Sequence, residues 1–166
     1  MKQLTVIRHA KSSWEYPHLS DFERPLNSRG ERNAPMVGQI LRDEGIQFDQ
    51  IVSSSANRAI TTARVVAGEM GYGEKQIREE QSFYGASPNT IVDILKGLGH
   101  SVDHAAVFGH NPTFHSLVEQ LANTTIEKFP TCAAATISLD IDKWPDLEAG
   151  RGELTALRLP RDYTDK

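Results

Sequence analysis

Short apolar stretches that alternate with helical patterns constrain the fold of this chain more than any other feature. The stretches are rich in β-branched residues, as buried strands are, and each is bounded by polar or turn-forming residues. The predicted strands are Gln3–Ile7, Gln50–Ser53, Ile77–Glu79 and Ala105–Gly109. The predicted helices are Asn27–Glu44, Ala56–Met70, Ser87–Leu98 and Asn111–Ala122. Such alternation is typical of a mainly parallel sheet with helices on both faces.

Capping residues and prolines set the expected helix boundaries. Asn27 or Ser28 is a suitable cap for the first helix, whereas Pro35 inside it predicts a kink or a later start. The pairs Ser87-Pro88 and Asn111-Pro112 each predict a cap followed by proline at the first helical position.

The last part of the chain follows a different pattern. Two apolar stretches, Ala134–Ile141 and Glu153–Leu159, have no helix between them and predict a terminal β-hairpin around the loop at 144–152. The length of 166 residues suits one domain over 1–166. We therefore expect an α/β three-layer sandwich with a mainly parallel central sheet and a C-terminal β-hairpin.

Charge and cysteine content narrow the range of partners and compartments. The 22 acidic and 18 basic side chains give a net charge of −4, which disfavours nucleic acid and anionic membrane as partners. The single cysteine, Cys132, is predicted to be buried packing, and a chain without a cysteine pair suits a reducing compartment. The apolar stretch Leu4–Ile7 is too short for a signal peptide, so we expect a cytoplasmic protein.

Polar clusters follow three of the predicted strands at the point where each strand ends. They are Arg8-His9, the segment Ser53–Arg58, and His110-Asn111. Parallel strands would bring these clusters to one edge of the sheet, close to the helix amino-termini near Ala56 and Pro112. Two guanidiniums, two imidazoles and helix amino-termini suit an anion with several oxygens, and phosphate is the natural candidate.

The same residues suit phosphoryl transfer to a histidine. A neutral His9 could attack the phosphorus in line and form a phosphohistidine that water then hydrolyses. Positive charge from Arg8 and Arg58 would lower the pKa of His9 and keep its ring neutral. We expect Arg8, Arg58 and His110 to bind the phosphate, with His110 donating a hydrogen bond to it. Asn111 is predicted to cap its helix and to contribute to substrate binding.

Three segments resemble one known family. The strings IRHAKSSW at 7–14, SSSANRAITTA at 53–63 and FGHNP at 108–112 are similar to motifs of the histidine phosphatase superfamily, in its phosphoglycerate-mutase-like branch. The compact length and DFERPLNSRG at 21–30 resemble most the small SixA-type phosphohistidine phosphatases. The resemblance implies that the family's Arg-His pair is Arg8 and His9, its second arginine Arg58 and its second histidine His110. It also implies a phosphoglycerate-mutase-like fold.

The proton donor for the leaving group has two candidates. Asp21 matches an acidic position of the compact group, and Glu80 precedes Phe83-Tyr84-Gly85 much as a mutase-type glutamate precedes its Tyr-Gly, but one residue out of register. Asp21 is favoured slightly. A phosphohistidine substrate needs a strong acid less, since its leaving imidazole departs readily once it is protonated.

Other basic and histidine residues have simpler explanations. Lys11 and Arg24 could extend the positive field, but pairing of these residues with Asp21 or Glu23 is expected. His100 and His104 are predicted to face solvent. His18 and His115 are predicted to be surface or packing residues.

Motifs of other phosphoryl and metal enzymes are missing from the sequence. It has no Gly-Lys of a P-loop, no arginine six positions after Cys132, and no H-E-x-x-H zinc motif, so no metal or other cofactor is expected.

These observations predict a metal-independent phosphatase that acts through a phosphohistidine on His9, with phosphohistidine on a protein as its substrate. A phosphatase for a small phosphate ester and a non-catalytic phosphate-binding module are the alternatives. A mutase is less favoured, because so short a chain has little material to enclose a released intermediate.

Overall fold

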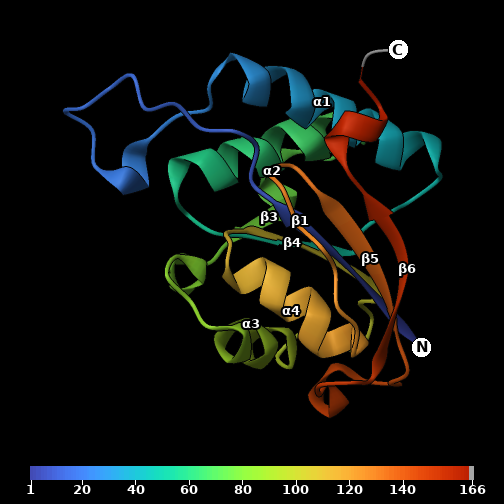
Figure 1. Ribbon diagram of the computed structural model, residues 1–166. Helices are drawn as coiled ribbons and strands as arrows, with labels where there is room; N and C mark the ends of the chain where they lie inside the picture. Colours follow the sequence, from blue (N-terminus) through green and yellow to red (C-terminus); the bar gives the residue numbers. More distant parts are fainter. Residues whose placement is uncertain (165–166) are drawn as a thin grey trace.

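The computed structural model describes residues 1–164. It has a central sheet covered by helices on both faces (Figure 1). Within these residues the six strands are β1 (Lys2–Arg8), β2 (Gln50–Ser53), β3 (Ile77–Glu79), β4 (His104–Gly109), β5 (Ala134–Leu139) and β6 (Gly152–Arg158). The helices are α1 (Ser28–Asp43), α2 (Asn57–Glu69), α3 (Pro88–Leu95) and α4 (Thr113–Ala122). The predicted α/β three-layer sandwich is confirmed.

The strands are arranged in the order β3-β2-β4-β1-β5-β6. Strands β1 to β4 are parallel, β5 is antiparallel to β1, and β6 is antiparallel to β5. The mainly parallel sheet and the C-terminal hairpin are therefore as predicted. Because β4 lies between β1 and β2, the carboxyl ends of these three strands meet at one edge of the sheet.

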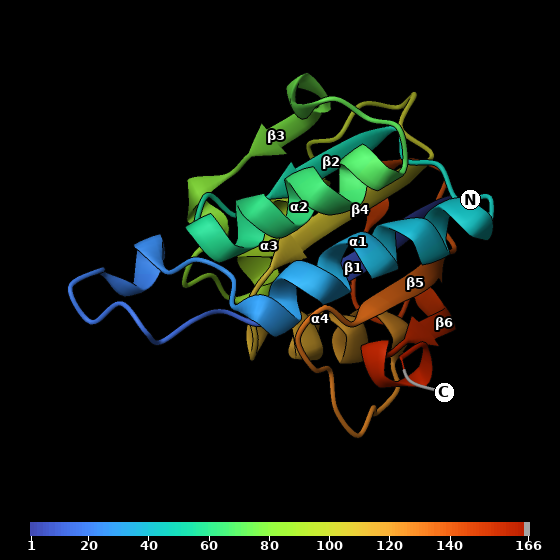
Figure 2. The same ribbon diagram turned by 90° about the horizontal axis from the view of Figure 1, so that it is seen from above.

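Alternating side chains of the strands build two cores. Leu4 and Val6 of β1 pack toward the side of α3 and α4, whereas Ile7 packs toward α1 and α2. Figure 2 shows α1 and α2 lying side by side across one face of the sheet. Burial on both faces explains why the strands read as nearly continuous apolar runs.

Helix α1 differs from the expectation at Pro35. Its cap is Asn27, whose Oδ1 accepts a hydrogen bond of 2.9 Å from the backbone N–H of Gly30. The helix begins at Ser28 and continues through Pro35 as one element, so the later start was wrong. Burial of Ala34 before the proline, and of Val37 and Leu41 after it, stabilises the helix on both sides of Pro35.

The ends of α3 and α4 also differ from the expectation. Helix α3 ends at Leu95, three residues early, because the N–H groups of Gly97 and Leu98 bond three residues back rather than four. Helix α4 begins at Thr113 and not at Pro112, which is its cap residue.

A long segment joins β1 to α1 and projects from the body of the molecule (Figures 1 and 2). Its base is closed by a bridge between Ser12 and Leu26 and by a hydrogen bond of 2.9 Å from the N–H of Asn27 to the carbonyl of Lys11. Near its tip it forms a short 3-10 helix, Asp21–Glu23. This segment carries several side chains of the site described next.

Candidate active site

The register of the sheet brings the first and third polar clusters together. Arg8 ends β1 opposite Gly109 of β4, and the N–H of His9 donates to the carbonyl of Gly109 over 3.0 Å. His110 follows directly, and its ring centroid lies 5.2 Å from that of His9. Neighbouring parallel strands thus place the two imidazoles side by side at the carboxyl edge.

The ring of His9 is held with one nitrogen free. Its Nδ1 lies 2.8 Å from the carbonyl oxygen of Ala10, an acceptor, so Nδ1 carries the proton and Nε2 keeps its lone pair. Burial lowers the pKa of His9 to about 3, with smaller contributions from His110 and the two arginines, against the raising effect of the Ala10 carbonyl. The ring is therefore neutral at neutral pH and can act as a nucleophile.

His110 is positioned through Ser54, which follows β2. Its Nε2 lies 2.8 Å from Ser54 Oγ, and that oxygen also accepts the N–H of Ala56 over 3.2 Å. The hydroxyl hydrogen of Ser54 can then go to Nε2, which puts the ring proton on Nδ1. Burial and the charge of Arg58 lower the pKa of His110 to about 4.

Two buried side-chain nitrogens have no hydrogen-bond partner among residues 1–164, and both belong to this group. They are Nδ1 of His110 and Nε of Arg8. Buried polar atoms are rarely left unpaired, since each costs free energy comparable to a lost hydrogen bond. Both nitrogens can donate, so an anionic ligand is a suitable partner.

The two predicted arginines come from different elements. Arg8 donates from Nη1 to the carbonyl of Phe129 over 3.2 Å, and burial together with Arg58 lowers its pKa. Arg58 lies in the first turn of α2, is 8% exposed, and donates from Nη1 to the carbonyl of Asp21 over 2.7 Å. The positive end of α2 therefore adds to the charge of this guanidinium.

One cavity of about 230 Å³ collects these side chains. It is lined by Arg8, His9, Lys11, Ser12, Trp14, Arg24, Arg58, His110, Asn111 and Thr131. A second hollow of about 500 Å³ shares Arg58, His110 and Asn111 with it and is walled by Phe83, Tyr84, Gly85, Ala86, Pro112 and Thr113. The predicted quartet Arg8, His9, Arg58 and His110 thus lines one space that has room for a phosphate group, with a wider hollow beside it.

Asp21 contacts the site as an ionised group. Its Oδ2 accepts from Arg58 Nη2 over 2.9 Å and from the Tyr84 hydroxyl over 2.5 Å, and its Oδ1 accepts from Arg24 over 3.0 Å. The bond from Tyr84, followed by those from Arg24 and Arg58, holds the pKa of Asp21 well below its usual range. A carboxylate in this state has no proton to give at neutral pH.

Glu80 is not brought to the cavity. It accepts a hydrogen bond of 2.8 Å from Arg78 Nη2 and another of 3.2 Å from Ser82 Oγ, and it lines neither hollow at the two histidines. Its place after β3, the edge strand beyond β2, separates it from β1.

Asn111 lines both hollows, but both of its polar side-chain atoms have partners within the protein. Its Nδ2 donates to the carbonyl of Phe129 over 2.8 Å, and its Oδ1 accepts from the N–H of His115 over 3.1 Å. Asn111 was predicted to be the cap residue of α4, but the helix begins one residue later, and Asn111 bonds its first turn from the position before the cap residue Pro112.

Sequence reasoning gave too little weight to Arg24, Trp14 and Tyr84. Arg24 is 7% exposed and pairs with Asp21 as expected, but it also lines the cavity and lies 3.3 Å from the centre of the Trp14 ring. Tyr84 joins Asp21 to the wall of the wider hollow. The position of Trp14, five residues after His9 in the same motif, could have indicated that the tryptophan lies at the cavity.

His104 and Cys132 have no place in the cavity. His104 was predicted to face solvent, which was wrong: it is 8% exposed and lies 2.7 Å from Thr5 Oγ1, because β4 begins one residue earlier than expected. Thr5 continues this buried chain of contacts to Thr136 over 3.0 Å, and Arg158 reaches Thr136 over 2.9 Å. Cys132 is buried as predicted, and burial raises its pKa to about 12.

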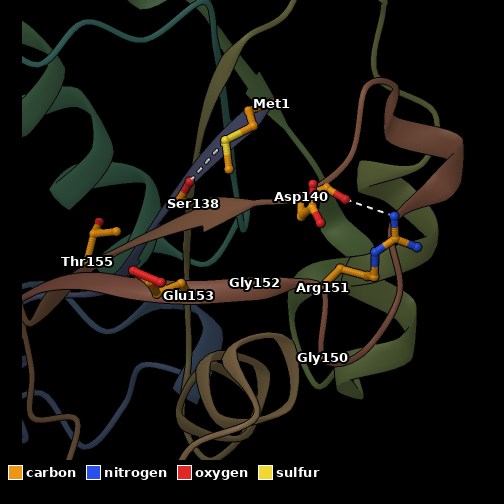
Figure 3. Close-up of a pocket in the computed structure, with 8 residues that line it drawn as sticks. All are labelled: Met1, Ser138, Asp140, Gly150, Arg151, Gly152, Glu153 and Thr155. Atoms are coloured by element: carbon orange, nitrogen blue, oxygen red, sulfur yellow. Dashed lines mark hydrogen bonds between the residues drawn. The ribbon is translucent and has the colours of Figure 1, made fainter.

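Figure 3 shows a further hollow, of about 550 Å³. It is lined by Met1 and by residues at the end of β5 and the start of β6, among them Ser138 and Glu153, with Arg151 donating to the carbonyl of Asp140 over 2.8 Å. These positions belong to the opposite edge of the sheet, so this hollow contains none of the predicted site residues.

Two classes of feature are missing from residues 1–164. No three His, Cys, Asp or Glu side chains gather closely enough to hold a metal ion. No helix in this part of the chain combines the length and apolarity needed to cross a membrane.

Comparison with known proteins gives the family. A family model described as the histidine phosphatase superfamily (branch 1) matches residues 4–83, which include Arg8, His9 and Arg58. The chain belongs to this superfamily, as the motifs predicted. Among its relatives, the uncharacterized protein Rv1276c of Mycobacterium tuberculosis is 32% identical over 166 residues, which cover 93% of this chain and 100% of the relative.

Solved structures share the fold along nearly the whole chain. The protein histidine phosphatase SixA complexed with tungstate is 21% identical with a TM-score of 0.84 and covers 98% of this chain and 99% of its own. Phosphoserine phosphatase of Entamoeba histolytica, in complex with 3-phosphoglyceric acid, is 16% identical with a TM-score of 0.65 and covers 96% of this chain and 98% of its own. The predicted phosphoglycerate-mutase-like fold is confirmed.

Proposed function

We propose that the chain is a phosphatase that forms a phosphohistidine on His9 and that its substrate is phosphohistidine on a protein. The observation that carries the proposal is the cavity of about 230 Å³ in which two imidazoles and two guanidiniums converge. The tungstate complex of the structurally similar SixA supports it, since tungstate, like phosphate, is a tetrahedral oxyanion.

The first step transfers the phosphoryl group to the protein. Arg8 and Arg58 bind the phosphate oxygens, and the lone pair on Nε2 of His9 attacks phosphorus opposite the leaving nitrogen. A bond from Nε2 to phosphorus forms while the bond from phosphorus to the substrate imidazole breaks, and that imidazole leaves with a proton. His110 donates from Nδ1 to the phosphoryl oxygens as their charge increases.

The second step returns the protein to its starting state. Water attacks the phosphorus of phospho-His9, the bond to Nε2 breaks, and inorganic phosphate leaves. The proton stays on Nδ1 throughout, hydrogen-bonded to the Ala10 carbonyl, so His9 is again neutral with its lone pair on Nε2. The sum is hydrolysis of one phosphoramidate to an imidazole and phosphate.

The surroundings of the two predicted acids favour phosphohistidine over an ester. Asp21 is ionised and Glu80 lies outside the cavity, so neither is placed to protonate an alkoxide leaving group. A phosphohistidine leaving group carries its own basic nitrogen and takes up a proton from solvent before the bond breaks. The open hollow of about 500 Å³ beside His110 leaves room for the protein that carries it.

A small phosphate ester is the second candidate substrate. The structural likeness to a phosphoserine phosphatase favours it, and the cavity volume suits a small ester equally well. A phosphate-binding module without turnover is the non-enzymatic alternative, and the neutral His9 with a free Nε2 argues against it.

A labelling experiment tests the proposal. Wild type, His9→Ala and the control His100→Ala, which removes an exposed histidine, are incubated with radiolabelled phosphohistidine peptide and with an aryl phosphate. We expect phosphate release and an acid-labile label on His9 in wild type and in the control, and neither in His9→Ala. Equal hydrolysis by wild type and His9→Ala would reject the mechanism, and a preference for small esters would favour the second candidate.

A further inference from the structure

A hollow of about 280 Å³ lies between α1 and the segment that follows β6, and three arginines line it. Its walls are formed by Arg29, Arg32 and Asn33 of α1 and by Pro160, Arg161 and Thr164, which follow β6. The three arginines are exposed, and no carboxylate is among these lining residues. One acidic group lies close by, since Asp162 Oδ1 is 3.8 Å from Arg161 Nε. Three guanidiniums around one hollow are a marked local excess in a chain of net charge −4.

Asn33 of α1 also lines this hollow and is 6% exposed. Its side-chain amide can donate to a carboxylate that enters between the arginines.

The hollow lies on the same side of the molecule as the catalytic cavity. Arg158, at the end of β6, pairs with Ala134, and Ala134 pairs with Ile7, so β6 and β1 end at the same edge. Arg161 follows that edge. At the other wall, α1 begins beside the backbone of Lys11, which lines the catalytic cavity.

We propose that Arg29, Arg32 and Arg161, the α1 arginine cluster, form a docking surface for an acidic segment of the phosphoprotein substrate. The inference rests on the proposed function and adds a specificity to it. The two hollows share no lining residue, so one small phosphate ester does not contact both, whereas a polypeptide can. Guanidiniums suit carboxylates because their donors match the two oxygens in a planar fork.

Charge reversal tests the docking surface. The test variant carries Arg29→Glu, Arg32→Glu and Arg161→Glu. The control carries Lys75→Glu, Lys96→Glu and Lys143→Glu, which change the net charge by the same amount. These exposed lysines lie near the opposite edge of the sheet: Lys75 just before β3, Lys96 after α3 and Lys143 after β5. The substrates are two phosphohistidine peptides, one with glutamates on both sides of the phosphohistidine and one with glutamines there.

We expect wild type and the control to prefer the acidic peptide by about tenfold in kcat/KM, mainly through KM, as a few exposed charge pairs acting together would give. The preference should shrink at high salt. The test variant should lose or invert it while hydrolysing an aryl phosphate at the wild-type rate. The milder set Arg29→Gln, Arg32→Gln and Arg161→Gln should remove the preference without inverting it, and it serves as the test if the charge reversal impairs folding.

Three outcomes would overturn the inference. They are an unchanged preference in the test variant, an equal loss of preference in the control, and no preference in wild type. The last outcome, with both peptides hydrolysed, rejects the docking surface alone. Failure of wild type to hydrolyse either peptide rejects the proposed substrate, and the docking surface with it.

Discussion

Acidification to about pH 5 should leave the ring of His9 neutral. An ordinary histidine, with a pKa of about 6.5, is only about 3% neutral at about pH 5. Burial lowers the pKa of His9 to about 3, with help from His110 and the arginines, and such a ring is about 99% neutral at about pH 5. The cavity therefore increases the neutral fraction by roughly thirtyfold, and the nucleophile persists in mild acid.

NMR titration of the histidine rings measures the neutral fraction of His9 directly. It needs no phosphate substrate, whose own ionisation would otherwise contribute to the pH dependence. The His9→Ala variant assigns the signal, and the exposed rings of His18 and His100 are recorded in the same spectra. We expect the His9 ring to carry its proton on Nδ1 and to stay neutral down to about pH 4. A midpoint near that of an ordinary histidine would refute the argument from burial.

The same shifts make folding stability depend on pH. The pKa values of His9, His104 and His110 are lowered to about 3, 4 and 4 in the folded protein. Between about pH 6.5 and those values the unfolded chain binds more protons than the folded one, so acid destabilises the fold. Each histidine should remove about 1–2 kcal/mol between about pH 6.5 and 5, measured by denaturant unfolding. Constant stability over this range would contradict the assignment of neutral rings.

Other predictions concern single positions. Arg58→Ala should reduce kcat/KM for an aryl phosphate by about 10²–10³, and a loss below about tenfold would show that its guanidinium is not needed. Gly30→Ala should destabilise the protein by about 1–3 kcal/mol, because the new Cβ would lie only 2.2 Å from the carbonyl oxygen of Lys11, with Gly68→Ala, which meets no atom within 4 Å, as its control. Cys132 should react with a thiol reagent only after unfolding, since burial raises its pKa to about 12, and rapid reaction in the native protein would contradict its burial.

The meeting of Arg8, His9, Arg58 and His110 could be predicted because it depends on one rule. In a parallel sheet, residues that follow the strands share an edge, and the motifs fix which residues follow. The C-terminal hairpin was predictable for a similar reason, since two apolar stretches without a helix between them pair locally.

The state of Asp21 could not be predicted, because its partners come from distant parts of the chain. Arg58 is 37 residues away and Tyr84 is 63 residues away, and only the folded loops bring them within hydrogen-bond distance. His104 was misassigned for a related reason. Its partner Thr5 is 99 residues away, and only the register between β1 and β4 sets their contact. The continuous path of α1 through Pro35 likewise reflects packing that local propensity does not encode.

The contacts from His104 through Thr5 and Thr136 to Arg158 cross four adjacent strands, and Arg158 ends on Glu44 beyond them. Sliding β5 or β6 by one residue would turn these side chains to the other face and break the links together. These polar contacts therefore favour one register of β5 and β6 over the others. Apolar packing alone would distinguish the registers less strongly. The same alignment also fixes where the segment 160–164 lies, beside Arg29 and Arg32 in the first turns of α1.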